Sequence, residues 1–160
     1  MAVSKQTSPL LTAANLDTLL SPTAEARTIG GVTWKLDGTI RWEGEVDVRT
    51  VLPMLASCRL RLVVNKLAPS EPKLQYLVKA GRNGFAARRL CLNVPHSPFD
   101  GTHKHRAEPG SGDEDTYEPD DIPELPLAPR VAPGTYRAIL EAFAKECFIE
   151  IGPDFVWTEP

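Results

Sequence analysis

All three histidines of this 160-residue chain fall within ten consecutive positions, and four cationic side chains flank them. Imidazoles exchange protons near neutral pH, and guanidinium and ammonium groups bind phosphate. The combination predicts a metal-independent phosphodiester site, in which one imidazole takes a proton from a nucleophile such as an RNA 2′-hydroxyl and another protonates the leaving oxygen. The candidate acid–base residues are His103, His105 and His96, and the candidate phosphate-binding residues are Arg89, Lys104, Arg106 and Arg88.

Two other interpretations of the same residues stay open. His96, His103 and His105, with Cys91 or Asp100, could supply four ligands to a metal ion, although no standard zinc spacing is present and the adjacent cations repel a metal. A polar hairpin end can also collect histidines that are only hydrogen-bonded or solvated. We favour the metal-free site and expect no cofactor.

Sequence periodicity predicts that a β-hairpin positions these residues. Apolar and polar side chains alternate over residues 88–94, turn-forming residues fill positions 95–101, and residues 102–106 form the returning strand. The histidines then lie at the mouth of the hairpin loop.

The pairing register of this hairpin decides which residues join the histidines. If paired position numbers have even sums, as with Asn93 opposite His103, the two strand histidines share a sheet face with Arg89 and Cys91. If the sums are odd, the cations at 104 and 106 join Arg89 instead, and the histidines lie opposite leucines. We favour the even register.

The same stretch resembles a known signature. The run Arg89-Leu-Cys-Leu-Asn-Val-Pro-His96, followed by Gly101-Thr-His-Lys-His105, is similar to the Arg…Pro-His…His-Lys-His pattern of TumE-like toxins from bacterial toxin–antitoxin modules and of related small bacterial families. Ser97 stands where such toxins often have a further histidine. The resemblance implies an RNA-directed toxin or a defence-associated relative, with a cognate antitoxin or another complex partner. By matching positions it implies roles for Arg89, His96, His103, Lys104 and His105.

The net charge of −3 conceals a strong asymmetry along the chain. Residues 1–107 hold 15 basic and 8 acidic residues, a net charge of +7, whereas residues 108–124 hold 8 acidic and no basic residues. Residues 125–160 have a net charge of −2. A segment of −8 beside a body of +7 can mask an anion-binding site when no substrate is bound.

The chain as a whole predicts one α+β domain, with an antiparallel sheet of five to seven strands in meander order and a C-terminal helix packed on one face. The strongest strand signals are a hairpin around Asp37-Gly38 and alternating runs at 60–64 and 74–78. The helix is predicted from residue 134 or 135, because apolar residues recur at helical spacing. These residues are Tyr136, Ile139, Leu140, Phe143 and Cys147.

Other segments carry weaker signals. We expect disorder at residues 1–8, a short helix ending at Ser21-Pro22, and another at 51–57 capped by Thr50. Residues 69–72 are predicted to turn the chain, and 148–157 to add an edge strand. From 107 to 133 the many acids and prolines predict a loop or disordered segment, with the acidic and proline-rich insertion at 108–132.

Composition limits the location and partners of the protein. No apolar run approaches the roughly 20 residues of a membrane span, so we expect no membrane partner. The three separated cysteines and the absence of a signal-peptide pattern favour the cytoplasm. We expect RNA or another phosphodiester as partner. The rival interpretation is a non-catalytic subunit that binds RNA or protein through a basic sheet face, formed by Arg59, Arg61, Lys73 and Lys79.

Overall fold

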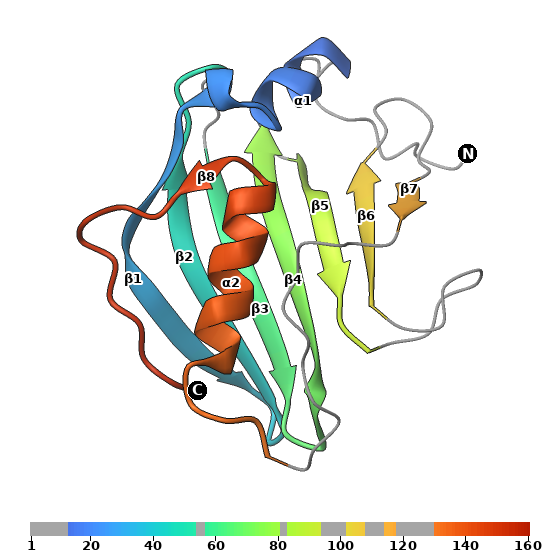
Figure 1. Cartoon of the computed structure of the whole chain (residues 1–160), viewed down its shortest axis with the longest axis vertical. Helices are drawn as coiled ribbons and strands as arrows, with labels where there is room; N and C mark the ends of the chain where they lie inside the picture. Colours follow the sequence, from blue (N-terminus) through green and yellow to red (C-terminus); the bar gives the residue numbers. More distant parts are fainter. Residues whose placement is uncertain (1–12, 54–56, 81–82, 94–101, 108–113, 118–129) are drawn as a thin grey trace.

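The computed structural model describes residues 13–53, 57–80, 83–93, 102–107, 114–117 and 130–160 (Figure 1), with only the backbone at 13, 80, 83–85, 103–107 and 114–117. The disorder expected at residues 1–8 lies outside this part of the chain. The elements are α1 (Ala13–Leu19), the 3-10 helix η1 (Pro22–Ala24), β1 (Ala26–Asp37), β2 (Arg41–Arg49), β3 (Ser57–Asn65), β4 (Ala68–Ala80), β5 (Asn83–Cys91), β6 (His103–Ala107), β7 (Glu114–Tyr117), α2 (Thr135–Glu146) and β8 (Ile149–Glu150).

The strands form one curled sheet in the order β7-β6-β5-β4-β3-β2-β1-β8, with α2 packed across one face (Figure 1). Every neighbouring pair is antiparallel except β1 and β8, which are parallel. The six longer strands, β1 to β6, follow chain order, and the short β7 and β8 close the two edges. The prediction of an α+β fold with a meander sheet, a C-terminal helix and a short N-terminal helix is confirmed.

Alternation along the strands separates two faces of the sheet. We call the face that packs against α2 the inner face and the opposite one the outer face. On the inner face Leu74, Tyr76 and Leu90 are fully buried, and the helix contributes Ile139 and Phe143, also fully buried. Apolar side chains at every second strand position and at a period of 3.6 residues on the helix therefore form a single core, as the sequence predicts.

The first hairpin brings the C-terminal segment against β1. Trp34 lies opposite Gly44, and a Cβ atom at Gly44 would approach the Trp34 ring to 2.7 Å, so the glycine makes room for the indole. The Trp34 Nε1–H donates to the Thr158 carbonyl oxygen at 2.7 Å, and the ring stands edge-on to Trp157. The indole is therefore a packing residue that holds the end of the chain along β1.

The helix predicted at 51–57 is wrong. Residues 51–53 form a bend and Ser57 already begins β3, so no helix spans 51–57. The Thr50 hydroxyl instead donates to the Pro53 carbonyl oxygen at 2.6 Å and closes a turn.

The prolines of 69–72 lie inside β4 and do not turn the chain. The turn comes earlier, where the Leu67 N–H donates to Asn65 Oδ1 at 2.8 Å. The β3–β4 ladder is irregular between Val63 and Asn65, so the missing N–H of each proline falls where regular pairing is interrupted.

The acidic stretch is not wholly a loop. Glu114–Tyr117 forms β7 and pairs with β6, because a partner strand can recruit a segment that has no apolar period of its own. Of the rest of the predicted insertion, 108–113 and 118–129 lie outside the described residues, and 130–132 form neither helix nor strand. Neither α1 nor α2, the α-helices of the described chain, is long and apolar enough to cross a membrane.

Candidate functional site

The β5–β6 pair has the even register that the sequence favours. Arg89 lies opposite His105, and Cys91 lies opposite His103. Asn93 was the predicted partner of His103, so the pairing differs from the prediction by two residues and the faces are unchanged. Directly opposed residues of an antiparallel pair share a face of the sheet. His103 and His105 therefore occupy outer-face positions with Arg89. His96 and Asp100 lie outside the described residues.

A β-bulge determines which arginine takes the outer face. Ala86 pairs with Leu77 and Arg88 with Tyr76, so Ala87 is an extra residue in β5. This residue shifts the alternation by one position. Arg88 consequently lies on the inner face with Tyr76, and Arg89 on the outer face with Gln75.

Arg88 connects the sheet to the end of α2. The residue is 8% exposed, and Nη1 donates to the Glu146 carbonyl oxygen at 2.9 Å and to the Glu146 carboxylate at 3.0 Å. A cation is favourable at a helix C-terminus, where backbone carbonyl groups lack partners. The guanidinium therefore serves the fold, and we do not retain Arg88 among the phosphate-binding candidates.

Lys104 and Arg106 are separated from the histidines by the register. They lie opposite Leu90 and Arg88, which are inner-face positions. The register thus assigns the four predicted cations to different faces, and only Arg89 shares the outer face with the histidine positions.

The outer face places polar residues in rows that cross the strands. One row runs through Arg61, Gln75, Arg89 and His105, each opposite the next in a ladder. The neighbouring row runs through Val63, Lys73, Cys91 and His103. Adjacent strands lie roughly 4.8 Å apart, so these rows connect the histidine positions with β4 and β3 over short distances.

A hollow of about 400 Å³ opens on the outer face beside Arg89. It brings together residues of β2, β3, β4 and β5 that are far apart in the sequence. Its polar lining consists of Arg41, Asn65, Glu71, Lys73, Gln75 and Arg89, and Val63 and Ala68 complete it. The lining holds three cations and one acid, and Arg41 also forms a 3.1 Å ion pair with Glu43. The net positive charge of the hollow is therefore supplied by Lys73 and Arg89.

The arginines of β3 are less available than their sequence positions suggest. Glu45 accepts from Arg59 Nη1 at 2.8 Å and from Arg61 Nε at 2.9 Å. Burial raises the pKa of Glu45, but the hydrogen bonds and charges of both arginines outweigh it, and the pKa lies below its ordinary value of 4.5. Two of the four residues of the predicted basic track are thus bound to a carboxylate, which leaves Lys73 and Lys79 as its exposed cations.

This arrangement predicts a measurable pH dependence of stability. Because the pKa of Glu45 is lowered in the folded state, the ionised pairs stabilise the fold above pH 4.5, and that contribution is lost as the pH falls through the folded-state value. Glu45→Gln should lower the free energy of unfolding at pH 7 by about 1 kcal/mol, since these groups are partly exposed. Urea unfolding from pH 7 to pH 3 should show a smaller pH dependence in the variant. Glu141→Gln, in an exposed pair with Arg137, is the control. An equal pH dependence in wild type and Glu45→Gln would contradict this account.

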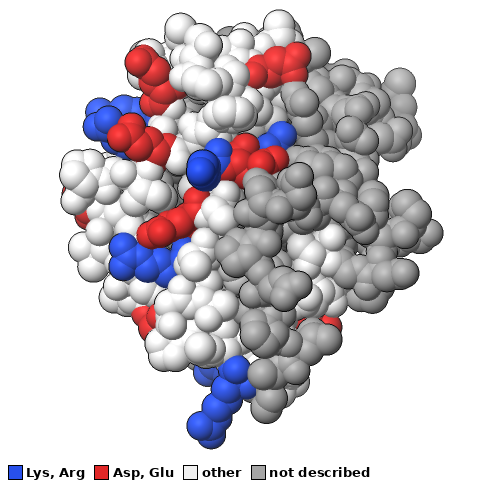
Figure 2. All heavy atoms as spheres, in the orientation of Figure 1, with Lys and Arg blue, Asp and Glu red and all other residues white. Residues whose placement is uncertain are grey.

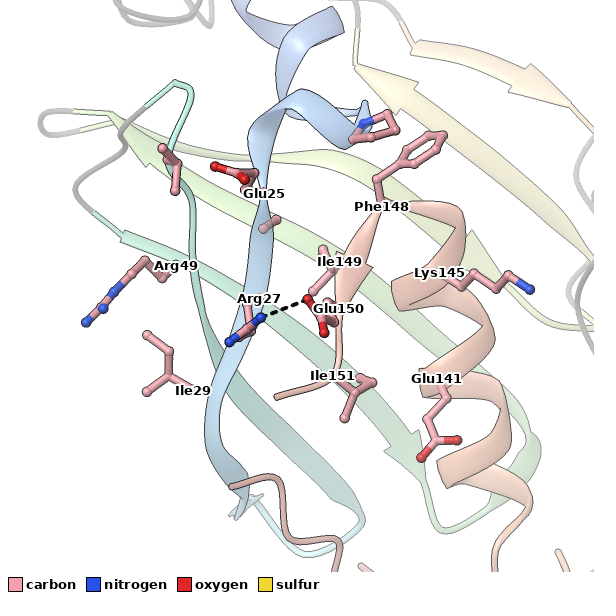
Figure 3. Close-up of a pocket in the computed structure, with 13 residues that line it drawn as sticks. Glu25, Arg27, Ile29, Arg49, Glu141, Lys145, Phe148, Ile149, Glu150 and Ile151 are labelled. Carbon is pink, nitrogen blue, oxygen red and sulfur yellow. Dashed lines mark hydrogen bonds and ion pairs between the residues drawn. The ribbon is translucent and has the colours of Figure 1, made fainter. Parts of the chain in front are cut away.

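A larger hollow, of about 840 Å³, lies where β1 and β8 approach α2 (Figure 3). Arg27 and Glu150 form an ion pair of 3.1 Å within it. Its lining holds three acids, three bases and no histidine or cysteine. It therefore has no net charge and no imidazole or thiol for proton transfer. The charged residues are Glu25, Arg27, Arg49, Glu141, Lys145 and Glu150. Acidic and basic side chains are also interspersed over the described atoms on the α2 side (Figure 2).

The cysteines are packing residues. Cys58, Cys91 and Cys147 are buried and form no disulfide. Burial raises the pKa of Cys58 to about 12, which disfavours a thiolate. Among the side chains that the structure describes, no group of three from His, Cys, Asp or Glu could hold a metal ion. The side chains of the proposed histidine ligands lie outside that description.

Sequence reasoning missed part of the polar lining of the hollow. Gln75 follows Lys73 by two positions, so alternation along β4 could have found it. Arg41 begins β2 and Asn65 ends β3. No local signal in the sequence connects either residue with Arg89. Comparisons with protein-family models, curated proteins and solved structures give no match for this chain.

Proposed function

We propose that this protein acts on RNA and cleaves its phosphodiester backbone without a metal ion, at the outer-face positions of β5 and β6. The observation that supports the proposal is the register, which sets His105 opposite Arg89 and His103 one pair further along the same face. In this proposal His103 and His105 exchange protons, and Arg89 binds the phosphate. His96 is a third candidate for proton transfer, on the grounds of sequence alone.

The reaction needs two proton transfers and one displacement at phosphorus. One imidazole removes the proton of the 2′-hydroxyl, whose oxygen attacks the adjacent phosphorus. The other, protonated, imidazole donates its proton to the departing 5′-oxygen. The guanidinium of Arg89 stabilises the charge that develops on the phosphoryl oxygens. The products are a 2′,3′-cyclic phosphate and a free 5′-hydroxyl.

The resemblance to TumE-like toxins extends the proposal to partners and location. It favours a toxin or defence-associated relative that acts in the cytoplasm and is held inactive by a cognate antitoxin. The chemistry proposed for His103, His105 and Arg89 does not require this partner. The partner would instead control access to the site.

The test is incubation of the purified protein with a single-stranded RNA, with and without EDTA. We expect cleavage in both conditions, 2′,3′-cyclic phosphate ends, and no cleavage of the same sequence made as DNA, which lacks the attacking hydroxyl. Loss of activity in EDTA with recovery on adding zinc would assign the site to metal chemistry. Binding of RNA without cleavage would favour the second candidate, a non-catalytic RNA-binding subunit, for which the cationic hollow is the supporting observation.

We further predict that the acidic segment competes with RNA for the cationic face. Deleting 108–124 would remove β7 and expose the edge of β6, so substitution of the acids by Asn and Gln is the cleaner experiment. The substituted protein should bind RNA about fivefold more tightly, a gain of about 1 kcal/mol, with a steeper dependence on salt. Fluorescence anisotropy measures both quantities. The control is Glu25→Gln with Glu141→Gln, two acids of the hollow between β1, β8 and α2. An unchanged affinity in the substituted protein would show that the segment masks nothing.

A further inference from the structure

We infer that the hollow beside Arg89 is a second subsite for single-stranded RNA, which binds a phosphate and a base a few nucleotides away from the bond that is cleaved. The inference rests on the proposed function and names the substrate that it requires. Its basis is that Lys73 and Arg89 line one hollow of about 400 Å³ with the amide side chains of Asn65 and Gln75. No sequence motif brings these four residues together.

The strand pairing places the two cations close to each other and to the histidine positions. Lys73 lies opposite Cys91, so it is the diagonal neighbour of Arg89, at roughly 7–8 Å. Arg89 lies directly opposite His105. A polynucleotide that crosses the strands from β6 towards β3 therefore meets the acid–base positions, then Arg89, then Lys73.

The distances set the length of RNA that can reach the hollow. Lys73 and His103 are two strand spacings apart in one row, roughly 10 Å. A stacked strand rises 3.4 Å per nucleotide, so this distance corresponds to about three nucleotides. A dinucleotide can fill the cleavage site but does not extend as far as Lys73.

The charges and hydrogen-bonding groups of the hollow favour a single strand. Glu71 is the one acid of the lining and repels phosphate, so the anion is expected between Lys73 and Arg89. Asn65 Oδ1 accepts from the Leu67 N–H, so its side-chain NH₂ can donate only to a different acceptor. Amide groups that both donate and accept suit the exposed edge of an unpaired base. In a duplex that edge is already occupied by the complementary strand.

The chain offers a closely matched control for Lys73. Lys79 lies on the same strand and the same face and is also exposed, but it does not line the hollow. The two lysines are six positions apart, roughly 20 Å along β4. Lys73→Ala and Lys79→Ala therefore remove the same charge from the protein, and only the first removes it from the subsite.

The experiment measures binding with oligoribonucleotides of increasing length that carry a 2′-deoxy residue at the scissile position, so that nothing is cleaved. Wild-type affinity should rise steeply from two to about six nucleotides and then level off. Lys73→Ala should lower the affinity for the longer oligonucleotides about tenfold, reduce the salt slope by about 0.7, and leave the dinucleotide unchanged. Lys79→Ala should reproduce the wild type.

The outcomes separate the subsite from the proposed cleavage activity. Equal losses in Lys73→Ala and Lys79→Ala, or a loss that does not depend on length, would overturn the subsite even if ribose-containing RNA is cleaved. Selective weakening by Lys73→Ala without any cleavage by the wild type would overturn the proposed reaction and support the subsite. No affinity for RNA at any length, with binding of an acidic protein instead, would overturn both.

Discussion

His105→Ala and His103→Ala should each slow RNA cleavage by about 10²-fold or more, the typical contribution of one general acid or base. The expectation follows from the β5–β6 register, which assigns both residues to the face of Arg89. RNA affinity should stay within a few-fold of the wild type, because proton transfer contributes to the transition state and not to substrate binding. Single-turnover cleavage and binding to the 2′-deoxy oligonucleotide measure the two effects separately.

Arg89→Ala should behave differently from the histidine variants. A guanidinium that binds phosphate contributes to both the bound substrate and the transition state, so affinity and rate should fall together. Lys79→Ala controls for the loss of one positive charge from the outer face. Full activity in both histidine variants would remove them from the reaction.

The pH profile gives a readout that a structural role of the histidines would not change. Wild-type kcat/KM should be bell-shaped, because one imidazole must be neutral and the other protonated. Each single variant should lose one limb of the bell. A variant that keeps the full bell at a lower amplitude would indicate a disturbed fold and not the loss of a proton donor or acceptor.

Phe143→Ala should lower the free energy of unfolding by about 3–5 kcal/mol, the largest stability effect we expect. Phe143 is fully buried and belongs to the core between α2 and the inner face. Removing its ring leaves a cavity in that core. The urea unfolding midpoint and slope give the change directly, because a loss of stability shifts the midpoint and leaves the slope unaltered.

The chain provides its own control for that substitution. Phe148 lies five positions further along and is 46% exposed, so about half of its surface already contacts water in the folded protein. Phe148→Ala should cost about 1 kcal/mol. Similar losses in the two variants would mean that Phe143 is not a core residue of the protein in solution.

Periodicity in the sequence was sufficient for the main elements of the fold. Alternation in β3 and β4, and the apolar spacing of Tyr136 to Cys147 in α2, are local properties that do not depend on what packs against them. The Asp37-Gly38 turn is local in the same sense, because the two residues supply the backbone conformation that a tight hairpin requires. These signals predicted the meander and the helix over the sheet.

Composition was a poorer guide than periodicity. The prolines at 69–72 predicted a turn, and the acids of 107–133 predicted a loop. A proline lacks only its backbone N–H donor, so an irregular ladder can include it. The residues of β7 keep both the N–H and the C=O group, so β7 can pair with β6. In both cases a residue type that is uncommon in strands was taken to exclude a strand.

The sequence by itself determined that three histidines and four cations lie around one hairpin, since these residues are adjacent in the chain. Only the tertiary structure decided which of them share a face. The extra residue Ala87 reverses the alternation of β5, directs Arg88 to Glu146 on α2 and leaves Arg89 opposite His105. The structure also brought Arg41 and Asn65 into one hollow with Arg89. Strand pairing joins residues that are distant in the chain, and a single bulge moves every following residue to the other face, so neither result is encoded in any local pattern.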